Sequence, residues 1–589
     1  MSDSAPSAAP GTAPSSAAPE PGLPWRSWVP LLVLSVLLNL PESVHRGLTP
    51  WLAIGLNGEV LLLAALAAGR PKLAPLAAIT WTGLMTYELA RLVSVYLMNQ
   101  DPVLYDQLQL FSHFALLLRD LWGGAGTAIL VLTFLGLAIV TVVASRLFAR
   151  GLAHARTRPY AIGAVALAAL AALPEGPWPA RWSLPSLVPN LQESYRVWKT
   201  VRTGFANSPY EVLDTLTLTR TPDVEVYIIE SYGRIVSDDA KSRAWWGGQL
   251  DVIEAQLATD GWHTASGFGT APVSGGRSWL ADASVQLGMR ISHESVFRHV
   301  VKHTDALPHL PGFLEDQGYS TVVVRPKDRD RPGARIYNNF GWDRGVFHDD
   351  LSYTGPVYGW GWIPDQFSLG VLREEVLPEV GSPRMVWFHG VSAHAPWQVI
   401  PPEPDDWRSL NDGDEEEDEE AWDREGAVKE LQFQLRRFKR TDFDYRRYKG
   451  SIDMLRSRYL KSVAYSLSVS FEHLGEADDA QADGRIVFIM GDHQPPILSR
   501  FDNADVPIHI VASDPALLAP FLRRGFEPGL APSAGARPAT AHEAMLTLIT
   551  GALAELDGQA APDMPDGLDV TRDLEPIRIK KYNQDEAMP

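Results

Sequence analysis

The chain has 589 residues and is acidic, with 71 Asp and Glu against 52 Lys and Arg and a formal net charge of -19. Nucleic-acid-binding proteins carry a basic footprint, so this balance argues against a nucleic-acid partner. There is no cysteine, which excludes disulfides and thiolate metal sites and leaves His, Asp, Glu and hydroxyl groups as metal ligands.

The first part of the chain is apolar. Residues 1–25, rich in Ala, Pro and Ser, predict a disordered tail, and residues 26–175 predict a transmembrane helical domain. We expect about five spanning helices, although the first and last are shorter than the ~20 residues that a bilayer core requires. These segments are residues 28–40, 51–69, 73–98, 126–147 and 159–173.

Charges around these segments predict the orientation of the chain. Basic residues follow the second segment and surround the connection from the fourth to the fifth: Arg70, Lys72, Arg146, Arg150, Arg156 and Arg158. The positive-inside rule places these connections and the N-terminus in the cytoplasm. Five crossings then place everything that follows on the extracytoplasmic side.

Three charged residues lie inside the predicted spans: Glu59, Glu88 and Arg91. Charges at that depth are candidates for function. Glu88 and Arg91 are three residues apart, however, so we expect them to pair on one helix face as a structural feature.

The rest of the chain reads as a linker, 176–210, and a catalytic domain, 211–589. Five β-branched, nearly continuous apolar runs predict strands, and longer stretches such as 448–474 between them predict helices. This alternation indicates an α/β domain with a mostly parallel sheet that helices cover on both faces. The predicted strands are 224–230, 320–324, 384–390, 485–490 and 506–512.

Polar residues gather where these strands end. The first strand ends in Glu230, the 384–390 strand is followed by His394, and the 485–490 strand leads into Asp492 and His493. Chemistry in such sheets collects beyond the carboxyl ends of the strands. Each residue alone has a structural alternative: a helix cap for Glu230, a packed loop for His394 and a turn for Asp492. Their shared placement favours one site.

A glycine-rich loop, "GTAPVSGGRSW", leads into Ser278 at the start of a helical pattern. A hydroxyl at a helix N-terminus lies near backbone N–H groups that stabilise an anionic group. An ordinary N-cap serine is the alternative, and Ser274 is a rival nucleophile four residues upstream.

In order, "IIESYGR", "GGRSW", "SAHAPW" and "GDHQPP" resemble the sulfatase-like branch of the alkaline phosphatase superfamily. The nearest likenesses are membrane-anchored lipoteichoic acid synthases and phosphoethanolamine transferases. The resemblance implies an alkaline phosphatase-like fold behind a membrane anchor, in a multi-pass protein of the bacterial inner membrane with a periplasmic catalytic domain.

The resemblance also implies a site. One divalent ion (Mn, Mg or Zn) would be held by Glu230, Ser278, Asp492 and His493, with Ser278 as the nucleophile and His394 beside the phosphate or leaving group. The transferases commonly have Thr at the nucleophile, where this chain has Ser. The [Cys/Ser]-x-Pro-x-Arg signature of true sulfatases is missing from the loop, which counts against sulfate-ester hydrolysis.

Substrate contacts are less clear in the sequence. Residues 325–347 depart from the transferase pattern, and Arg325 is the best candidate for binding an anion, with a solvated charged loop as the alternative. Asp365, in "GWGWIPDQF", is a candidate for the rim of the site, with a packed loop as the alternative. The acidic run 411–425 lacks the ligand order of an EF-hand and predicts a solvated insertion. "GVSAH" lacks the last glycine of an esterase elbow.

The resemblance implies a transferase that moves a phospho-alcohol head group from a phospholipid donor to a glycan or lipid acceptor of the envelope through a covalent serine intermediate. Two alternatives stay open. One is a phosphate or sulfate ester hydrolase with the same site. The other is an inactive relative that binds envelope polysaccharide.

Overall fold

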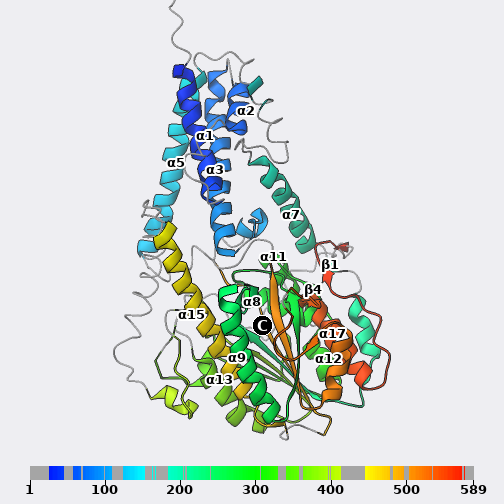
Figure 1. Ribbon diagram of the computed structural model, residues 1–589. Helices are drawn as coiled ribbons and strands as arrows, with labels where there is room; N and C mark the ends of the chain where they lie inside the picture. Colours follow the sequence, from blue (N-terminus) through cyan, green and yellow to red (C-terminus); the bar gives the residue numbers. More distant parts are fainter. Residues whose placement is uncertain are drawn as a thin grey trace, which may run out of the picture. The chain divides into compact units, whose positions relative to one another are not determined.

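The structure, a computed structural model, describes the chain in segments. They are residues 25–45, 57–67, 70–98, 100–108, 124–152, 162–163, 166, 183–202, 204–205, 208–238, 240–304, 307–328, 340–356, 358, 363–395, 397, 400–412, 445–477, 482–496, 503–533, 535–572 and 576–577. The chain divides into two compact units (Figure 1). The first is Met1–Leu92 with Gly124–Val188, and the second is Val93–Gly123 with Pro189–Pro589.

In the first unit, all the described secondary structure is helical. Helices occupy four of the predicted spans: α1 (Trp25–His45), α2 (Gly58–Ala67), α3 (Ala74–Met98, preceded by the 3₁₀ turn Pro71–Leu73) and α5 (Gly124–Leu152). The predicted fifth span, 159–173, lies almost wholly outside the described residues. Within the described helices, only Val131–Arg150 of α5 is long and apolar enough to cross a bilayer. The structure therefore supports one candidate span, and the five-helix bundle stays a prediction.

Charged residues of this apolar unit have structural partners. Arg91 Nη1 lies 3.9 Å from Glu88 Oε2, which confirms the predicted pair. Glu59 Oε1 accepts a hydrogen bond of 3.0 Å from the backbone N–H of Leu184. The pair of Glu88 with Arg91 is therefore structural, as predicted, whereas Glu59 has one bonded oxygen and one buried oxygen, Oε2, without a hydrogen-bond partner among the described residues.

The second unit is built on a mixed nine-stranded sheet in the order β10-β3-β9-β8-β2-β7-β5-β6, with β11 beside β3. All five predicted strands are present in it, and β8-β2-β7-β5-β6 run parallel as predicted. The strands are β2 (Asp223–Ile229), β3 (His263–Thr270), β5 (Ser320–Arg325), β6 (Arg344–Phe347), β7 (Arg384–His389), β8 (Arg485–Gly491), β9 (Asp505–Ala512), β10 (Glu527–Pro528) and β11 (Thr540–Ala541).

One predicted strand runs in the other direction. β9 is antiparallel to both of its neighbours, β8 and β3. A parallel return needs a crossover connection, usually through a helix. The connection from β8 to β9 contains no helix in its described part, residues 492–496 and 503–504. The chain therefore turns back along the sheet instead of crossing over it.

Two layers of helices enclose this sheet (Figure 1). Val224, Val226 and Ile228 of β2 face a core shared with α10, α12 and α17, whereas Tyr227 and Ile229 face a core shared with α9, α13 and α15. Both faces of the strand are apolar because both are covered. The helices are α9 (Ala240–Thr259), α10 (Ser278–Leu287), α12 (Leu310–Asp316), α13 (Asp365–Val371), α15 (Tyr445–Glu472) and α17 (Met545–Leu556).

Smaller elements complete the fold. Residues predicted as a linker contain α7 (Leu184–Arg202), and α15 occupies the stretch in which a helix was predicted at 448–474. Apart from residues 411 and 412, the acidic insertion 411–425 lies outside the described residues. The other elements are α8 (Ile235–Asp238), α11 (Glu294–Val300), α16 (Ala519–Arg523) and the two-stranded pairs β1 (Gly204–Phe205) with β13 (Pro576–Ile577) and β4 (Met289–Arg290) with β12 (Leu568–Asp569).

Candidate active site

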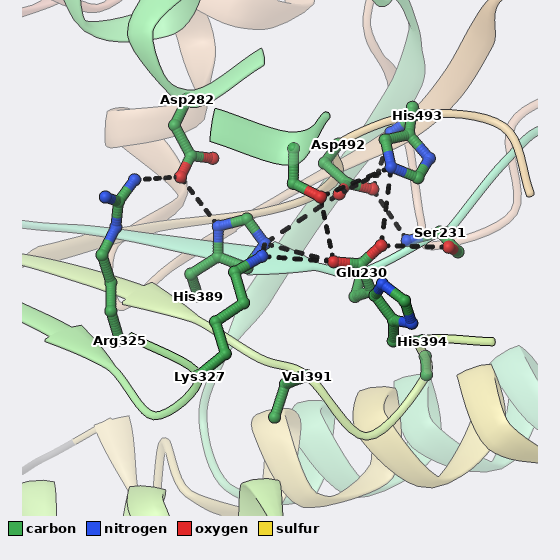
Figure 2. A network of polar contacts seen from close by, with 12 residues as sticks. Glu230, Ser231, Asp282, Arg325, Lys327, His389, Val391, His394, Asp492 and His493 are labelled. Atoms are coloured by element: carbon green, nitrogen blue, oxygen red, sulfur yellow. Dashed lines mark hydrogen bonds and ion pairs between the residues drawn. The ribbon is translucent and has the colours of Figure 1, made fainter. Parts of the chain in front are cut away.

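Three neighbouring parallel strands end at the same edge of the sheet. Ile228 of β2 pairs with His389 of β7, and Ile229 of β2 pairs with Gly491 of β8. The residues at these ends, Glu230, His389 and Asp492, are all buried and each offers a ligand atom, with these atoms within 4.8 Å of one another. The register of the sheet thus brings two carboxylates and an imidazole from distant parts of the chain into one cluster (Figure 2).

Asp492 has one satisfied and one unsatisfied oxygen. Its Oδ1 accepts hydrogen bonds of 2.7 Å from the backbone N–H groups of Ser231 and His493. Its Oδ2 is buried and has no hydrogen-bond partner among the described residues. A buried carboxylate oxygen without a donor is costly unless a cation lies against it.

His493 presents its Nε2 to the same place. Its Nδ1 lies 2.9 Å from the carbonyl oxygen of Gln494. A carbonyl can only accept, so Nδ1 carries a hydrogen and Nε2 is the ring nitrogen that faces the cluster. Nε2 lies 3.3 Å from Asp492 Oδ2 and 3.5 Å from Glu230 Oε1. A ring nitrogen in this position, with the outer nitrogen held by a carbonyl, fits a metal ligand.

Ser278 completes the cluster as the first residue of α10. Its Oγ donates to Glu230 Oε2 at 3.0 Å and lies 3.4 Å from His493 Nε2. The three preceding residues, Gly275, Gly276 and Arg277, all have positive φ angles of 70°, 141° and 69°. This tight turn is strained at Arg277, the one residue of the three with a side chain, and it delivers the hydroxyl to the site.

The rival nucleophile is placed differently. Ser274 is buried, and its hydroxyl has no hydrogen-bond partner within the described segments. Ser278 alone of the two has a hydrogen bond to Glu230. The geometry therefore favours Ser278.

Lys327, His389 and Asp282 belong to this site although the motifs did not single them out. Lys327 Nζ lies 3.3 Å from Glu230 Oε2 and 3.1 Å from His389 Nε2. His389 Nδ1 lies 2.8 Å from Asp282 Oδ2. Asp282 is four residues after Ser278 on α10, so both side chains project from the same face of the helix. His389 is the last residue of β7, and Glu230 and Asp492 each come directly after the end of a strand. This position at a strand end is the feature of the sequence that could have identified His389 as a site residue.

Neighbouring charges keep Lys327 cationic and Glu230 anionic, although Glu230 is buried and Lys327 is mostly buried. Burial alone would lower the pKa of Lys327, but the carboxylates of Glu230 and Asp282 outweigh it and raise that pKa. Burial alone would raise the pKa of Glu230, but the ammonium group of Lys327 holds it well below its usual range. Burial and the charge of Glu230 raise the pKa of Asp492. Two adjacent carboxylates of this kind favour a bound cation.

His394 lies beside Glu230 in the loop after β7 (Figure 2). Its Nδ1 is 2.6 Å from the carbonyl oxygen of Ala395, so this nitrogen carries the hydrogen. Burial, with smaller contributions from Lys327 and His493, lowers the pKa of His394 although Glu230 opposes the shift. The ring is therefore neutral at neutral pH.

Two of the residues predicted to contact substrate, Asp365 and Arg325, have partners within the protein. Asp365 does not lie at a rim but is fully buried beneath the loop that carries His394. There its Oδ1 accepts hydrogen bonds from the backbone N–H groups of Val391 at 2.7 Å and Ser392 at 3.1 Å. Arg325 contacts Asp282, the carboxylate that also holds His389. The structure thus gives both residues supporting contacts: Asp365 for the loop of His394, Arg325 for Asp282. Most of the charged stretch after Arg325, and Trp360 and Trp362, lie outside the described residues.

The residues present fit a divalent cation. Glu230, Asp492, His493 and Ser278 offer carboxylate oxygens, an imidazole nitrogen and a hydroxyl, a donor set that Mn²⁺, Mg²⁺ and Zn²⁺ accept. The unpartnered Asp492 Oδ2 and the orientation of His493 are the observations that support this fit.

No protein-family model matches the chain, and no curated protein matches it in sequence. Solved structures similar to it include the lipooligosaccharide phosphoethanolamine transferase A (EptA) from Neisseria meningitidis, at 12% identity and a TM-score of 0.42 over 92% of this chain and 98% of that chain. The lipoteichoic acid synthase LtaP from Listeria monocytogenes has 13% identity and a TM-score of 0.35 over 64% of this chain and 81% of that chain. The phosphoglycerol transferase GacH from Streptococcus pyogenes, solved with sn-glycerol-1-phosphate, has 12% identity and a TM-score of 0.33 over 65% of this chain and 84% of that chain.

Proposed function

We propose that the chain is a metal-dependent phosphotransferase that moves a phospho-alcohol head group from a phospholipid to a glycan or lipid acceptor. The observation that carries the proposal is the Ser278 hydroxyl, at the N-terminus of α10 and 3.0 Å from Glu230, in a cluster where Asp492 keeps a buried, unpartnered oxygen. A nucleophile, an anion-stabilising helix terminus and a cation site meet at one point.

Each residue has a role in this proposal. Glu230, Asp492, His493 and Ser278 would hold the divalent ion, which when bound lowers the pKa of the serine hydroxyl and stabilises charge on the phosphoryl oxygens. Lys327, which stays an ammonium, stabilises the same developing negative charge. Asp282 orients His389 through its Nδ1.

The reaction proceeds in two displacements. Ser278 Oγ forms a bond to phosphorus while the bond from phosphorus to the diacylglycerol oxygen breaks. The proton that leaves Ser278 is balanced by the proton that the departing oxygen gains, and His394 relays it. In the second displacement the hydroxyl of the acceptor gives its proton to the relay and takes the phosphoryl group, and Ser278 recovers its proton.

The covalent intermediate provides the test. Full-length protein in detergent with Mn²⁺ or Zn²⁺ and a fluorescent phospholipid is expected to release diacylglycerol and to gain the mass of the head group on the peptide that contains Ser278. Ser278→Ala removes both signals, whereas Ser274→Ala, as a matched control, retains them. Release of diacylglycerol by Ser278→Ala at the wild-type rate would exclude Ser278 as the nucleophile, and head-group release to water alone would identify a hydrolase.

A further inference from the structure

Helix α7 exposes an apolar stripe on one side. Leu191, Tyr195 and Trp198 have 50%, 62% and 36% of their surface exposed, and their spacing of four and three residues places them on one face of the helix. The rings of Tyr195 and Trp198 stack with their centroids 5.6 Å apart.

Cations border this stripe. Arg196, Lys199 and Arg202 are exposed on the same helix, and the guanidinium of Arg202 lies 4.9 Å from the centre of the Trp198 ring. The one acidic residue of α7, Glu193, forms an ion pair with Arg196 at 2.8 Å, so the helix carries three cations and one anion. A local excess of positive charge stands out in a chain whose net charge is -19.

The opposite side of α7 is attached to the catalytic unit by polar contacts. Asn190 Oδ1 accepts from the backbone N–H of Leu104 at 3.2 Å, and Ser194 Oγ accepts from that of Tyr105 at 3.3 Å. Glu193 Oε1 lies 3.4 Å from His293 Nε2. These contacts fix how the helix is rotated, so the apolar stripe is turned away from the unit that holds it.

We propose that this face of α7 lies in the interfacial layer of a phospholipid bilayer with anionic head groups. Aliphatic, Tyr and Trp side chains beside Lys and Arg form the composition that membrane interfaces select. The helix also follows, in sequence, the apolar unit that contains the candidate span Val131–Arg150. The cores of protein–protein interfaces are instead depleted of lysine. The inference concerns where the protein touches lipid, so it goes beyond the chemistry proposed for Ser278.

The lack of cysteine makes a direct test possible, because each introduced cysteine is a unique site for a nitroxide label. Full-length protein carrying Tyr195→Cys is labelled and reconstituted in nanodiscs of phosphatidylethanolamine and phosphatidylglycerol. The matched control is Arg196→Cys, the next residue, which points about 100° away around the helix. Collision rates with oxygen, which partitions into lipid, and with a water-soluble nickel chelate then report the depth of each label.

We expect a several-fold higher ratio of oxygen to nickel collisions for the label at 195 than for that at 196. The double substitution Lys199→Glu with Arg202→Glu should lower this ratio at 195, and Lys302→Glu, a charge change outside α7, should not. Equal exposure of both labels to nickel would overturn the proposal. So would protection of the label at 195 from both reagents, because the stripe would then be covered by protein, such as a second copy of the chain. Neither collision rate depends on catalysis, so the proposed membrane contact of α7 is tested independently of the proposed transferase activity.

Discussion

At the scale of single residues, Asp492 divides its two oxygens between structure and chemistry. Oδ1 is held by two backbone N–H groups, and Oδ2, which has no hydrogen-bond partner among the described residues, is the oxygen proposed to bind a cation. Asp492→Asn keeps an oxygen that can accept from the backbone but removes the anionic ligand. We expect a folded protein whose affinity for Mn²⁺ or Zn²⁺ falls at least about 100-fold, the upper end of what changes in outer-shell partners alone produce.

Metal content after dialysis, measured by mass spectrometry, checks this prediction. Asp238→Asn, a change of the same kind at an exposed carboxylate that pairs with Arg234, is the control and should keep the wild-type content. Equal metal in Asp492→Asn and the wild type would contradict the assignment of Asp492 as a ligand.

The lowered pKa of His394 predicts how turnover depends on pH. Because its pKa is lowered from 6.5, the ring stays neutral as the pH falls through 6.5 and gains a proton only at lower pH. If neutral His394 accepts the proton of the acceptor hydroxyl, the acid limb of the kcat profile lies below pH 6.5. His394→Gln should lower kcat by about 10²- to 10⁴-fold and remove that limb. A limb that persists unchanged in His394→Gln would belong to another group.

At the scale of elements, the sequence predicts strands well where both faces are buried. Both sides of these strands are apolar, because helices cover both faces of the sheet; the strands are β2, β5, β7, β8 and β9. β3, "HTASGFGT", escapes this pattern since its residues are small. A Cβ added at Gly269 would lie 2.5 Å from Cδ1 of Ile508, so a larger residue there would displace the end of that side chain on the neighbouring strand.

The same contrast holds for the candidate site. Glu230, Asp492, His493 and Ser278 are found from short motifs, and the parallel register then brings their strands together. Lys327 lies in a charged stretch where sequence does not distinguish it from its neighbours. Its position is fixed only when β5 and β7 pair and bring its ammonium to 3.1 Å from His389. For Asp365 the sequence leaves a rim position and a packed loop open, and the structure shows the packed position.

Near the amino-terminal ends of β2 and β8 lies a buried ion pair that stabilises the fold and is not part of the candidate site. Arg485 of β8 donates to Glu225 of β2 at 2.7 Å and 2.8 Å. Burial opposes ionisation, yet Arg485 lowers the pKa of Glu225 to about 2. The stabilisation is therefore present above the ordinary pKa of 4.5 and is lost as the pH falls toward 2.

Arg485→Met should leave this buried carboxylate with only the Tyr227 hydroxyl and the more distant Arg384, and lower the free energy of unfolding by about 3–5 kcal/mol. Adding Glu225→Leu should recover most of the loss, because the uncompensated charge is then gone. Denaturant unfolding of the full chain in detergent measures both variants. A double variant as unstable as Arg485→Met would mean that lost packing, and not the orphaned charge, dominates.

At the scale of the whole molecule, the two compact units should respond differently to metal. The candidate ligands all belong to the unit formed by Val93–Gly123 and Pro189–Pro589. An ion that binds only the folded state stabilises it by RT ln(1 + [L]/Kd), or about 2.7 kcal/mol at a hundredfold excess over Kd. Calorimetry of the full chain should therefore show one transition that moves up by a few degrees on adding Mn²⁺ or Zn²⁺. Transitions of the apolar helical unit should stay in place.

Variants decide whether this shift comes from the proposed site. Ser278→Ala keeps Glu230, Asp492 and His493 and should retain most of the metal-induced shift while losing turnover. Asp492→Asn should lose both, and a chelator should lower the transition of the wild type to that of Asp492→Asn. If the shift survives in Asp492→Asn, the stabilising ion binds elsewhere. If Ser278→Ala loses the whole shift, the hydroxyl contributes more to holding the ion than the two carboxylates, and the cluster at the strand ends is not sufficient to bind it.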